Sequence, residues 1–377
     1  MQKNVLTKLI RSSLKSTYII SLYLEVDGKK YPNDEYLIVL KELLKEVKQS
    51  IQTYSDEQKK NLLDNFDAIW NHFQLNYERA QEKTIALFCS ANKRLWELIP
   101  LSIQLRSSLV IREYPYLRPL IQALHLQKKF GTLLIDRTKA VFCLSSNDDT
   151  KAVTSLSTEV PQKVKAAGYK GYAEKKMERH IEDHVQRHFK NVAEKLIQFC
   201  NKNECDHLIL GGEKRNIEDF TSYLSEIWKS KVIAGIFLNV ESDIKEISQK
   251  AHAALQKFYS EKEIVLLEKI KQEALAKGLG TYGLEGVFEA IRHKQVSSLA
   301  VKQNFSLPGK KCKNCNWLHI NITTCQVCGS KMVDAPDIIE EAINESLLQN
   351  SDVYVVAYHP SMIAEMEGIG ALLRFQI

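Results

Sequence analysis

Two Cys-X-X-Cys pairs constrain what this chain can fold into more than any other feature. Cys312 and Cys315 form the first pair, Cys325 and Cys328 form the second, and nine residues separate the pairs. This spacing is typical of two tight turns that hold one tetrahedral Zn²⁺ through four thiolates. Because so short a segment cannot bury a core of its own, the metal would supply folding energy. We therefore predict a structural zinc ribbon, inserted at about 306–333, with no open position for catalysis.

The other cysteines and the bulk composition fit an ordinary intracellular protein. Cys89, Cys143, Cys200 and Cys205 are scattered in apolar or helical surroundings and read as small buried residues, not as disulfide partners. A length of 377 residues is enough for two or three domains. No apolar run approaches the roughly 18 residues of a membrane span, and the N-terminal residues lack the features of a signal peptide. We expect a cytoplasmic monomer with no membrane partner.

Strand and helix patterns alternate along most of the chain, which predicts an α/β fold. We divide it into an N-terminal α/β domain at 1–126, a middle strand-helix domain with a long helix at 127–259, and a C-terminal α-β-α sandwich at 260–377 that carries the zinc ribbon. In the middle domain we expect one helix at about 216–229. A further helix at 242–258 is expected to end before another begins near Glu261.

The middle domain contains a glycine-bearing loop at 160–175 that leads into the long helix. Apolar residues recur along this helix at three- and four-residue steps, at Met177, Ile181, Val185, Phe189, Val192, Leu196 and Phe199. Between residues 163 and 190 there are eight Lys or Arg against four Asp or Glu. A basic loop beside a rigid helix suits a polyanionic partner. His180, His184 and His188 share one face, which we interpret as a solvated basic face in preference to a metal site.

The charge is distributed unevenly. From residue 331 to the end there are eight acidic residues and only two basic ones, Lys331 and Arg374. This imbalance indicates either a second partner surface or a differently solvated face. Gly211-Gly212 after a strand lacks the lysine of a phosphate-binding loop and reads as a strand-to-helix turn. No nucleophile-base pair and no paired carboxylates stand out, so the residues give no positive sign of an enzyme.

Several short stretches carry a family resemblance. They are Met177-Glu178-Arg179-His180, Gly278-Leu-Gly-Thr-Tyr-Gly283, the glycine-bearing end Glu367–Arg374, and, in the first domain, Ile20–Leu24 and Arg118-Pro119-Leu120. In these residues and in the order of its parts, the chain resembles the archaeal and eukaryotic class-one translation release factors and their relative Pelota. It is most similar to the divergent bacterial branch of that superfamily. A four-cysteine ribbon in the third domain also occurs in archaeal members.

One departure from the family decides the functional expectation. Release factors hydrolyse peptidyl-tRNA with a Gly-Gly-Gln loop. Here Gly168 and Gly171 are not adjacent, and the nearby glutamine, Gln162, precedes them. The stop-codon-reading Asn-Ile-Lys-Ser tetrapeptide is also missing from the first domain. The resemblance then implies a protein that binds the ribosomal A site in ribosome rescue or hibernation without peptidyl-tRNA hydrolysis, and therefore no catalytic residues.

The same resemblance implies the contacts. It places ribosomal RNA or tRNA phosphates against basic side chains, bases against tyrosines, and two flexible glycines between them, at Lys163, Lys165, Gly168, Tyr169, Lys170, Gly171, Tyr172, Lys175, Lys176 and Arg179. A translational GTPase is the partner expected at the acidic C-terminal domain. Two alternatives remain open. One is a peptidyl-tRNA-hydrolysing release or rescue factor with an altered loop, and the other is a non-ribosomal adaptor that retains the fold.

Overall fold

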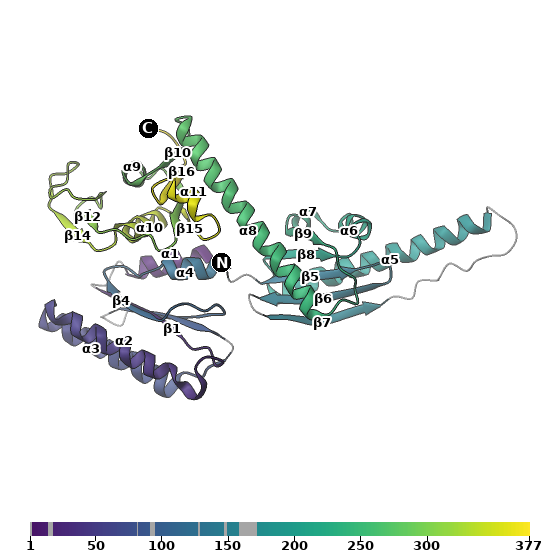
Figure 1. Ribbon diagram of the computed structural model, residues 1–377, viewed down its shortest axis with the longest axis horizontal. Coiled ribbons are helices and arrows are strands. Elements are labelled where there is room, and N and C mark those ends of the chain that lie inside the picture. The colour runs from purple at the N-terminus through teal and green to yellow at the C-terminus, as the bar shows by residue number, and fades with distance from the viewer. Residues whose placement is uncertain are drawn as a thin grey trace. The chain divides into compact units, whose positions relative to one another are not determined.

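The computed structural model describes residues 2–13, 18–80, 82–90, 95–126, 129–146, 149–157 and 172–377 (Figure 1). The chain divides into two compact units. Unit 1 combines the N-terminal segment Met1–Leu126 with the C-terminal segment Ser260–Ile377, and unit 2 is Gln127–Tyr259. Within the described residues, unit 2 has one sheet and unit 1 has several, and each unit buries apolar clusters of its own.

The N-terminal segment of unit 1 contains an antiparallel sheet in the order β3-β2-β1-β4. The strands are β1 (Ile19–Glu25), β2 (Thr84–Ser90), β3 (Trp96–Leu101) and β4 (Ser108–Arg112). One face is covered by α2 (Tyr36–Ser50) and α3 (Asp56–Asn71), which lie side by side in both ribbon views. Three short helical segments flank these helices: η1 (Pro32–Asp34), η2 (Ile51–Thr53) and η3 (His72–Asn76). Helix α3 begins with a reciprocal capping box between Ser55 and Gln58.

The C-terminal segment of unit 1 contains a second sheet in the order β10-β16-β11-β15, in which β11 and β15 are parallel. Its strands are β10 (Gly280–Tyr282), β11 (Val296–Lys302), β15 (Asp352–Val356) and β16 (Ile369–Leu373). Helices α9 (Leu284–Arg292) and α10 (Ile338–Leu348) pack on one face, and α11 (Pro360–Ala364) and the end of α8 pack on the other. This is the predicted α-β-α sandwich.

The two sheets of unit 1 share one apolar core. Helices α1 (Gln2–Ser13) and α4 (Arg118–Leu126) pack on the face of the first sheet opposite α2 and α3, and their apolar residues join those of α9 and α10 in one cluster. At this junction the buried Arg118 guanidinium lies 3.1 Å from Asp337 Oδ2 and 3.3 Å from Glu340 Oε2. Unit 1 is therefore held together by contacts between the two ends of the sequence.

Unit 2 is built on a five-stranded sheet in the order β7-β6-β5-β8-β9. Its strands are β5 (Phe130–Ile135), β6 (Lys139–Ser146), β7 (Asp149–Ser157), β8 (His207–Gly211) and β9 (Val232–Ile236). The strands β5, β8 and β9 are parallel, so their carboxyl ends share one edge. Helices α5 (Tyr172–Asn203), α6 (Lys214–Thr221) and α7 (Glu226–Lys229) cover one face, and the first part of α8 (Ile244–Leu275) covers the other.

The predicted fold class is confirmed, with several local corrections. The predicted helix at 216–229 is two short helices, α6 and α7, with a turn between them. The helices expected on either side of Glu261 form one helix of 32 residues, α8. Strand β7 was not predicted. The three-domain division stays a prediction beside the two compact units. Within the described ranges, no helix is long and apolar enough to cross a bilayer.

Candidate functional site

The four clustered cysteines come together in a small subdomain of unit 1. A three-stranded sheet, β13-β12-β14, supports them, with β12 at Gly309–Cys312, β13 at Leu318–His319 and β14 at Met332–Ala335. The sulfur atoms of Cys312 and Cys328 are 3.5 Å apart, those of Cys315 and Cys325 are 3.5 Å apart, and those of Cys315 and Cys328 are 3.7 Å apart. All four lie within 4.8 Å of one another.

These distances fit a tetrahedral metal site. A metal–sulfur bond of about 2.3 Å implies sulfur–sulfur edges of roughly 3.8 Å in a regular tetrahedron. The ligand set is four thiolates, which is the set that structural zinc sites use. Four protein ligands fill the tetrahedron, so such a centre would leave no position for water or substrate. The residues therefore fit a structural metal ion.

The two turns that present the sulfurs are closed in the same way. The amide of Asn316 donates to the carbonyl of Cys312, and the amide of Gly329 donates to the carbonyl of Cys325, each four residues after the first cysteine of its pair. Asn316 and Gly329 both have positive φ, of 58° and 70°. Glycine and asparagine adopt this left-handed conformation at low cost, so the residues after each pair permit the sharp turn.

The pKa values of the exposed thiol of Cys328 and the less exposed thiol of Cys315 are shifted in opposite directions. Hydrogen bonds from the side chain and backbone of Ser330 lower the pKa of Cys328 to about 6. Burial raises the pKa of Cys315 to about 12. Neighbouring thiols behave in this way when one carries the first negative charge and the others are then harder to ionise. A bound cation would favour the thiolate form of all four.

Side chains of the ribbon attach it to the rest of unit 1. The indole Nε1 of the buried Trp317 donates to Glu289 Oε1 at 2.8 Å. The Lys311 ammonium lies between Glu341 and Glu345, at 2.9 and 3.0 Å. It also lies 4.5 Å from the ring centre of Tyr114. The functional groups of Trp317 and Lys311 are therefore engaged within unit 1.

Much of the acidic charge near the C-terminus is also used internally. Asp337, Glu340 and Glu345 are buried, and Glu341 pairs with Lys311. At the surface, Asp334 pairs with Lys310, and Glu365 pairs with Lys271. The acidic patch expected from composition is therefore smaller than the residue count suggests, because these carboxylates serve the packing of unit 1.

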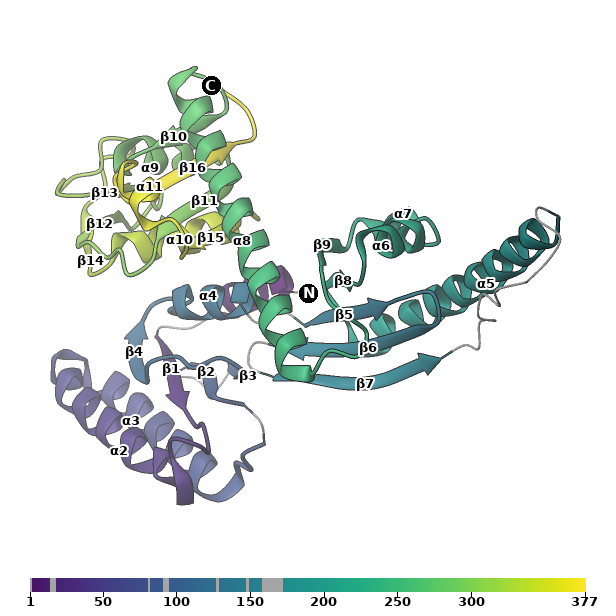
Figure 2. The same cartoon turned by 45° about the vertical axis from the view of Figure 1, so that its right-hand side comes forward.

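The predicted RNA-contacting segment falls largely outside the described residues. This applies to Lys163, Lys165, Gly168, Tyr169, Lys170 and Gly171. Tyr172, Lys175 and Lys176 belong to the first turns of α5, and Arg179 is an exposed residue further along that helix. Figures 1 and 2 show the start of α5 extending beyond the strands of the unit 2 sheet. The four clustered cysteines belong to unit 1, whereas this basic segment belongs to unit 2.

The histidine row on α5 differs from its interpretation in the sequence. His180 is exposed, and its ring stacks on that of His184 with 4.7 Å between centroids. His188 is only 1% exposed. Burial lowers the pKa of His188, and a hydrogen bond to the backbone of Lys139 opposes this shift. The expected solvated face is therefore wrong for His188, because α5 turns its third histidine against the β5–β6 turn.

Sequence reasoning also missed two groups of residues. The Arg118, Asp337 and Glu340 cluster combines residues more than 200 positions apart, and no local pattern signals such a pairing. The polar residues at the carboxyl ends of β5 and β8 had a usable signal, because Asp136 and Gly212 each follow an apolar strand directly. In the sequence, Gly212 was interpreted only as part of a strand-to-helix turn.

Comparison with known proteins shows which proteins this chain is similar to. Residues 115–256, which span α4 and nearly all of unit 2, match the model of "Bacterial archaeo-eukaryotic release factor family 10". The chain is 24% identical to peptide chain release factor subunit 1 of Methanocaldococcus jannaschii, in an alignment that covers 100% of this chain and 97% of that protein. It is 29% identical to the same subunit of Methanopyrus kandleri, over 54% of this chain and 51% of that protein.

Solved structures of the same group are similar at a lower level. The archaeal termination factor aRF1 matches with a TM-score of 0.27 and 17% identity, over 100% of this chain and 99% of that one. Dom34 of S. cerevisiae, a translation termination-like factor, matches with a TM-score of 0.45 and 9% identity, over 78% and 86% of the two chains. Part of this chain, residues 115–256, therefore matches a bacterial release-factor family model, and the whole chain is similar in sequence to an archaeal peptide chain release factor subunit.

Proposed function

We propose that this protein binds the ribosome in the manner of a release factor but does not hydrolyse peptidyl-tRNA, and that it acts in ribosome rescue or hibernation in the cytoplasm. The proposal is carried by one observation. The chain aligns along its whole length with a peptide chain release factor subunit, yet its loop at 160–175 contains no Gly-Gly-Gln. A protein that is similar in sequence to a release factor along its whole length, but lacks its hydrolytic loop, would occupy the same ribosomal site without ending translation.

The contacts in this proposal are electrostatic and aromatic. Lys163, Lys165, Lys170, Lys175, Lys176 and Arg179 would meet phosphates of ribosomal RNA or tRNA, Tyr169 and Tyr172 would stack on unpaired bases, and Gly168 and Gly171 would let the loop adapt. Repulsion among these six basic side chains is small when each of them is paired with a phosphate. Affinity should then fall steeply with salt, because each neutralised phosphate releases a counterion.

The proposal also includes one Zn²⁺ per chain, held by Cys312, Cys315, Cys325 and Cys328. The four-thiolate set and the sulfur spacing support zinc as the metal. A translational GTPase partner belongs to the proposal through the family resemblance. Because much of the C-terminal acidic charge is engaged within unit 1, we expect shape and apolar contacts to contribute more to that docking than charge.

Ribosome co-sedimentation across a salt series tests the proposal. Purified protein is mixed with vacant bacterial ribosomes, beside a variant in which the six basic residues from Lys163 to Arg179 are changed to glutamate. We expect binding that weakens as salt rises, and its loss in the variant. The control variant carries the same change of charge at exposed lysines of unit 1, at Lys41, Lys45, Lys48, Lys60, Lys269 and Lys277.

The outcomes separate the three functional hypotheses. Loss of binding in the loop variant alone supports the proposed contacts, and equal loss in the control means that net charge, not the loop, drives association. Absence of binding at low salt, with or without tRNA in the P site, favours a non-ribosomal adaptor. Release of labelled peptide from stalled ribosome complexes would identify a hydrolase with an altered loop and would contradict the non-hydrolytic role.

A further inference from the structure

A polar pocket lies at the edge of the unit 2 sheet where the parallel strands end. It encloses about 470 Å³, within the range of about 300–1,000 Å³ typical of small-ligand sites. Ile135 ends β5, Gly212 follows β8 directly, and Phe237 follows β9 directly. The carboxyl ends of parallel strands are the usual place for ligands in such sheets, because loops and helix starts meet there.

The floor of the pocket depends on Gly212. This residue has a φ of +149°, and a Cβ atom added to it would lie 2.4 Å from the carbonyl oxygen of Ile135. Only glycine lets the end of β8 pass so close to the end of β5. The chain then turns at once into α6, whose first amides have no carbonyl four residues back within the helix.

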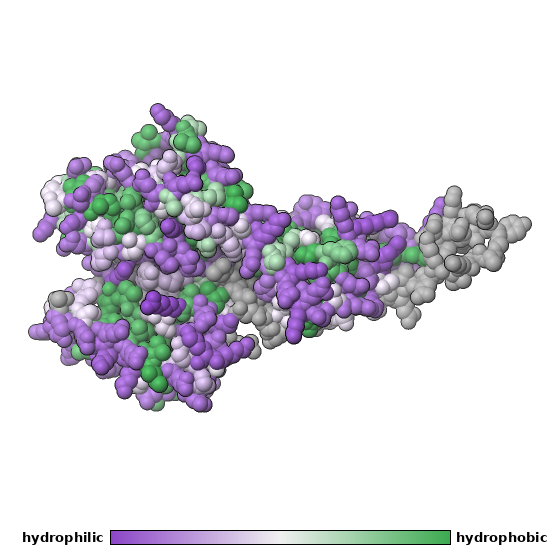
Figure 3. Space-filling view, in the orientation of Figure 1, coloured by the Kyte–Doolittle hydropathy of each residue, from purple (hydrophilic) through white to green (hydrophobic). Residues whose placement is uncertain are grey.

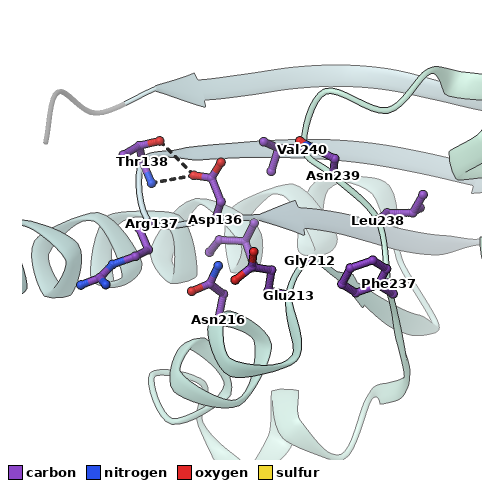
Figure 4. A pocket seen from close by; sticks show the side chains of 11 residues that line it. Asp136, Arg137, Thr138, Gly212, Glu213, Asn216, Phe237, Leu238, Asn239 and Val240 are labelled. Atoms are coloured by element: carbon purple, nitrogen blue, oxygen red, sulfur yellow. Dashed lines mark hydrogen bonds between the residues drawn. The ribbon is translucent and has the colours of Figure 1, made fainter. Parts of the chain in front are cut away.

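Two polar side chains at the start of α6, one of them from the residue just before the helix, face the pocket without partners among the described residues. Asn216 is 8% exposed, yet no described residue hydrogen-bonds to its amide group. Glu213 precedes the helix, is exposed, and makes no ion pair with a described residue. Figure 4 shows both side chains directed into the pocket, beside Asp136. They are three positions apart on consecutive turns, so a single ligand can contact both.

The neighbouring carboxylate, Asp136, already accepts hydrogen bonds from the β5–β6 turn. Asp136 Oδ1 accepts hydrogen bonds from the Thr138 amide, the Thr138 hydroxyl and the Lys139 amide, at 2.6, 3.0 and 2.6 Å. Its role is to fix the β5–β6 turn at the pocket wall, as the dashed lines in Figure 4 indicate. Because these bonds occupy Asp136 Oδ1, Glu213 is the carboxylate with both oxygens available to accept two hydrogen bonds from one ligand.

An aromatic ring completes the wall opposite these groups. Phe237 lines the pocket and is 77% exposed, which is unusual for an apolar ring of this size. In the orientation of Figure 3, an apolar patch also lies over the β8–β9 part of the sheet. An exposed ring beside polar hydrogen-bonding groups is the arrangement that recognises a nucleobase, because the base stacks on the ring and its edge is read by the polar groups.

We propose that this pocket binds a guanine base. Guanine is the RNA base whose Watson–Crick edge presents two adjacent N–H donors, from N1 and N2, and a carboxylate such as Glu213 accepts both. The O6 acceptor beside them would take a hydrogen bond from the Asn216 amide, and Phe237 would stack on the ring. The base can come from an unpaired guanosine of RNA or from a free guanosine nucleotide. The RNA source rests on the proposed ribosomal function, whereas the free nucleotide does not.

Calorimetric titration of the full chain with GMP, AMP, CMP and UMP tests the site directly. We expect GMP to bind most tightly. Phe237→Ala should weaken GMP binding about tenfold or more, while Ile227→Ala, which removes an exposed apolar side chain from α7 outside the pocket, should not. Glu213→Gln should reduce the preference for GMP over AMP, and Glu218→Gln on the exposed side of α6 should leave it unchanged.

RNA hairpins with one unpaired loop base, G or A, form the second arm. Preference for the G hairpin that is reduced in Glu213→Gln, with weaker hairpin binding in Phe237→Ala, supports an RNA base, and GMP binding without hairpin binding supports a free nucleotide. The absence of any guanine preference in both arms overturns the proposal. Co-sedimentation with ribosomes is measured separately, so a failure of ribosome binding with intact GMP binding would remove the proposed function and leave the guanine site standing.

Discussion

Arg118, Asp337 and Glu340 illustrate how single charged residues serve the fold of unit 1. Besides facing both carboxylates, the Arg118 guanidinium donates to the carbonyl of Phe305 at 2.6 Å. Glu340 Oε1 accepts from the amides of Leu117 and Arg118, at 2.7 and 3.3 Å. All three charged side chains are at least 95% buried. Removal of one partner would leave another charge buried and uncompensated, so this cluster is sensitive to substitution.

Glu340 should make unit 1 less stable as pH rises through mildly acidic values. Burial raises the pKa of its carboxyl from 4.5 to about 6. Between these values the unfolded chain has released the proton and the folded chain still holds it, so the free energy of unfolding falls with rising pH, by about 2 kcal/mol from this group. Glu340→Gln should abolish this contribution. Urea unfolding at pH 4.5, 5.5 and 6.5 measures it, with the exposed Glu285→Gln as control. Identical pH slopes for wild type and Glu340→Gln would contradict the assignment.

His188 should act in the opposite direction in unit 2. Burial lowers its pKa in the folded state. As pH falls below about 6.5, the unfolded chain binds a proton that the folded chain does not, so the free energy of unfolding decreases, by up to about 1.4 kcal/mol per pH unit. His188→Gln should remove this loss, because glutamine can still donate to the Lys139 carbonyl and does not titrate. Thermal unfolding at pH 5 and 7 measures the effect, with His184→Gln for comparison. If His184→Gln removed the pH response and His188→Gln did not, the assignment of this response to His188 would be wrong.

At the scale of elements, the sequence predicted those with a strong local pattern. The long helix and the two cysteine turns were each anticipated from spacing alone. Strand β7 was missed because its later residues, such as Thr154 and Ser155, are exposed at the sheet edge and carry no apolar alternation. Helix α8 was divided because its apolar stripe moves from one core, at Ile247 and Leu255, to another at Leu267. Periodicity detects one apolar face at a time. A helix that packs against two different cores has two such faces, so its pattern looks like two helices.

The ribbon should depend on metal as an element, while the sandwich below it should not. Its core consists of the cysteines with Trp317 and Met332, which is too little apolar area to fold without a metal. Cys312→Ser should lower bound zinc from one per chain to none, and limited proteolysis should then cleave between 309 and 335 first. Cys143→Ser, at a buried cysteine in unit 2, should keep its zinc. Elemental analysis that finds no zinc in the wild-type chain, or an iron cluster instead, would contradict the zinc assignment.

At the scale of the whole molecule, segments that are distant in the sequence pack into the same compact unit. Unit 2 is a continuous segment with its own cores on both faces of its sheet. Unit 1 is discontinuous, because α1 and α4 bury their apolar residues against α9 and α10. Sequence patterns locate segments that can fold, but they do not indicate which distant segments share a core. The third domain of the sequence interpretation is therefore a packing partner of the first.

This arrangement predicts how fragments of the chain should behave. The segment 127–259 should fold alone, because its core requires no other part of the chain. The segments 1–126 and 260–377 should each be less stable alone, since each would expose its half of the shared core, and they should associate when mixed. Arg118→Met in the first fragment should weaken this association, because it leaves Asp337 and Glu340 of the second without their guanidinium. Size-exclusion chromatography and urea unfolding of the mixture measure both effects, with Lys41→Met on the exposed face of α2 as the matched control. Two fragments that fold cooperatively and remain separate would instead support three independent domains.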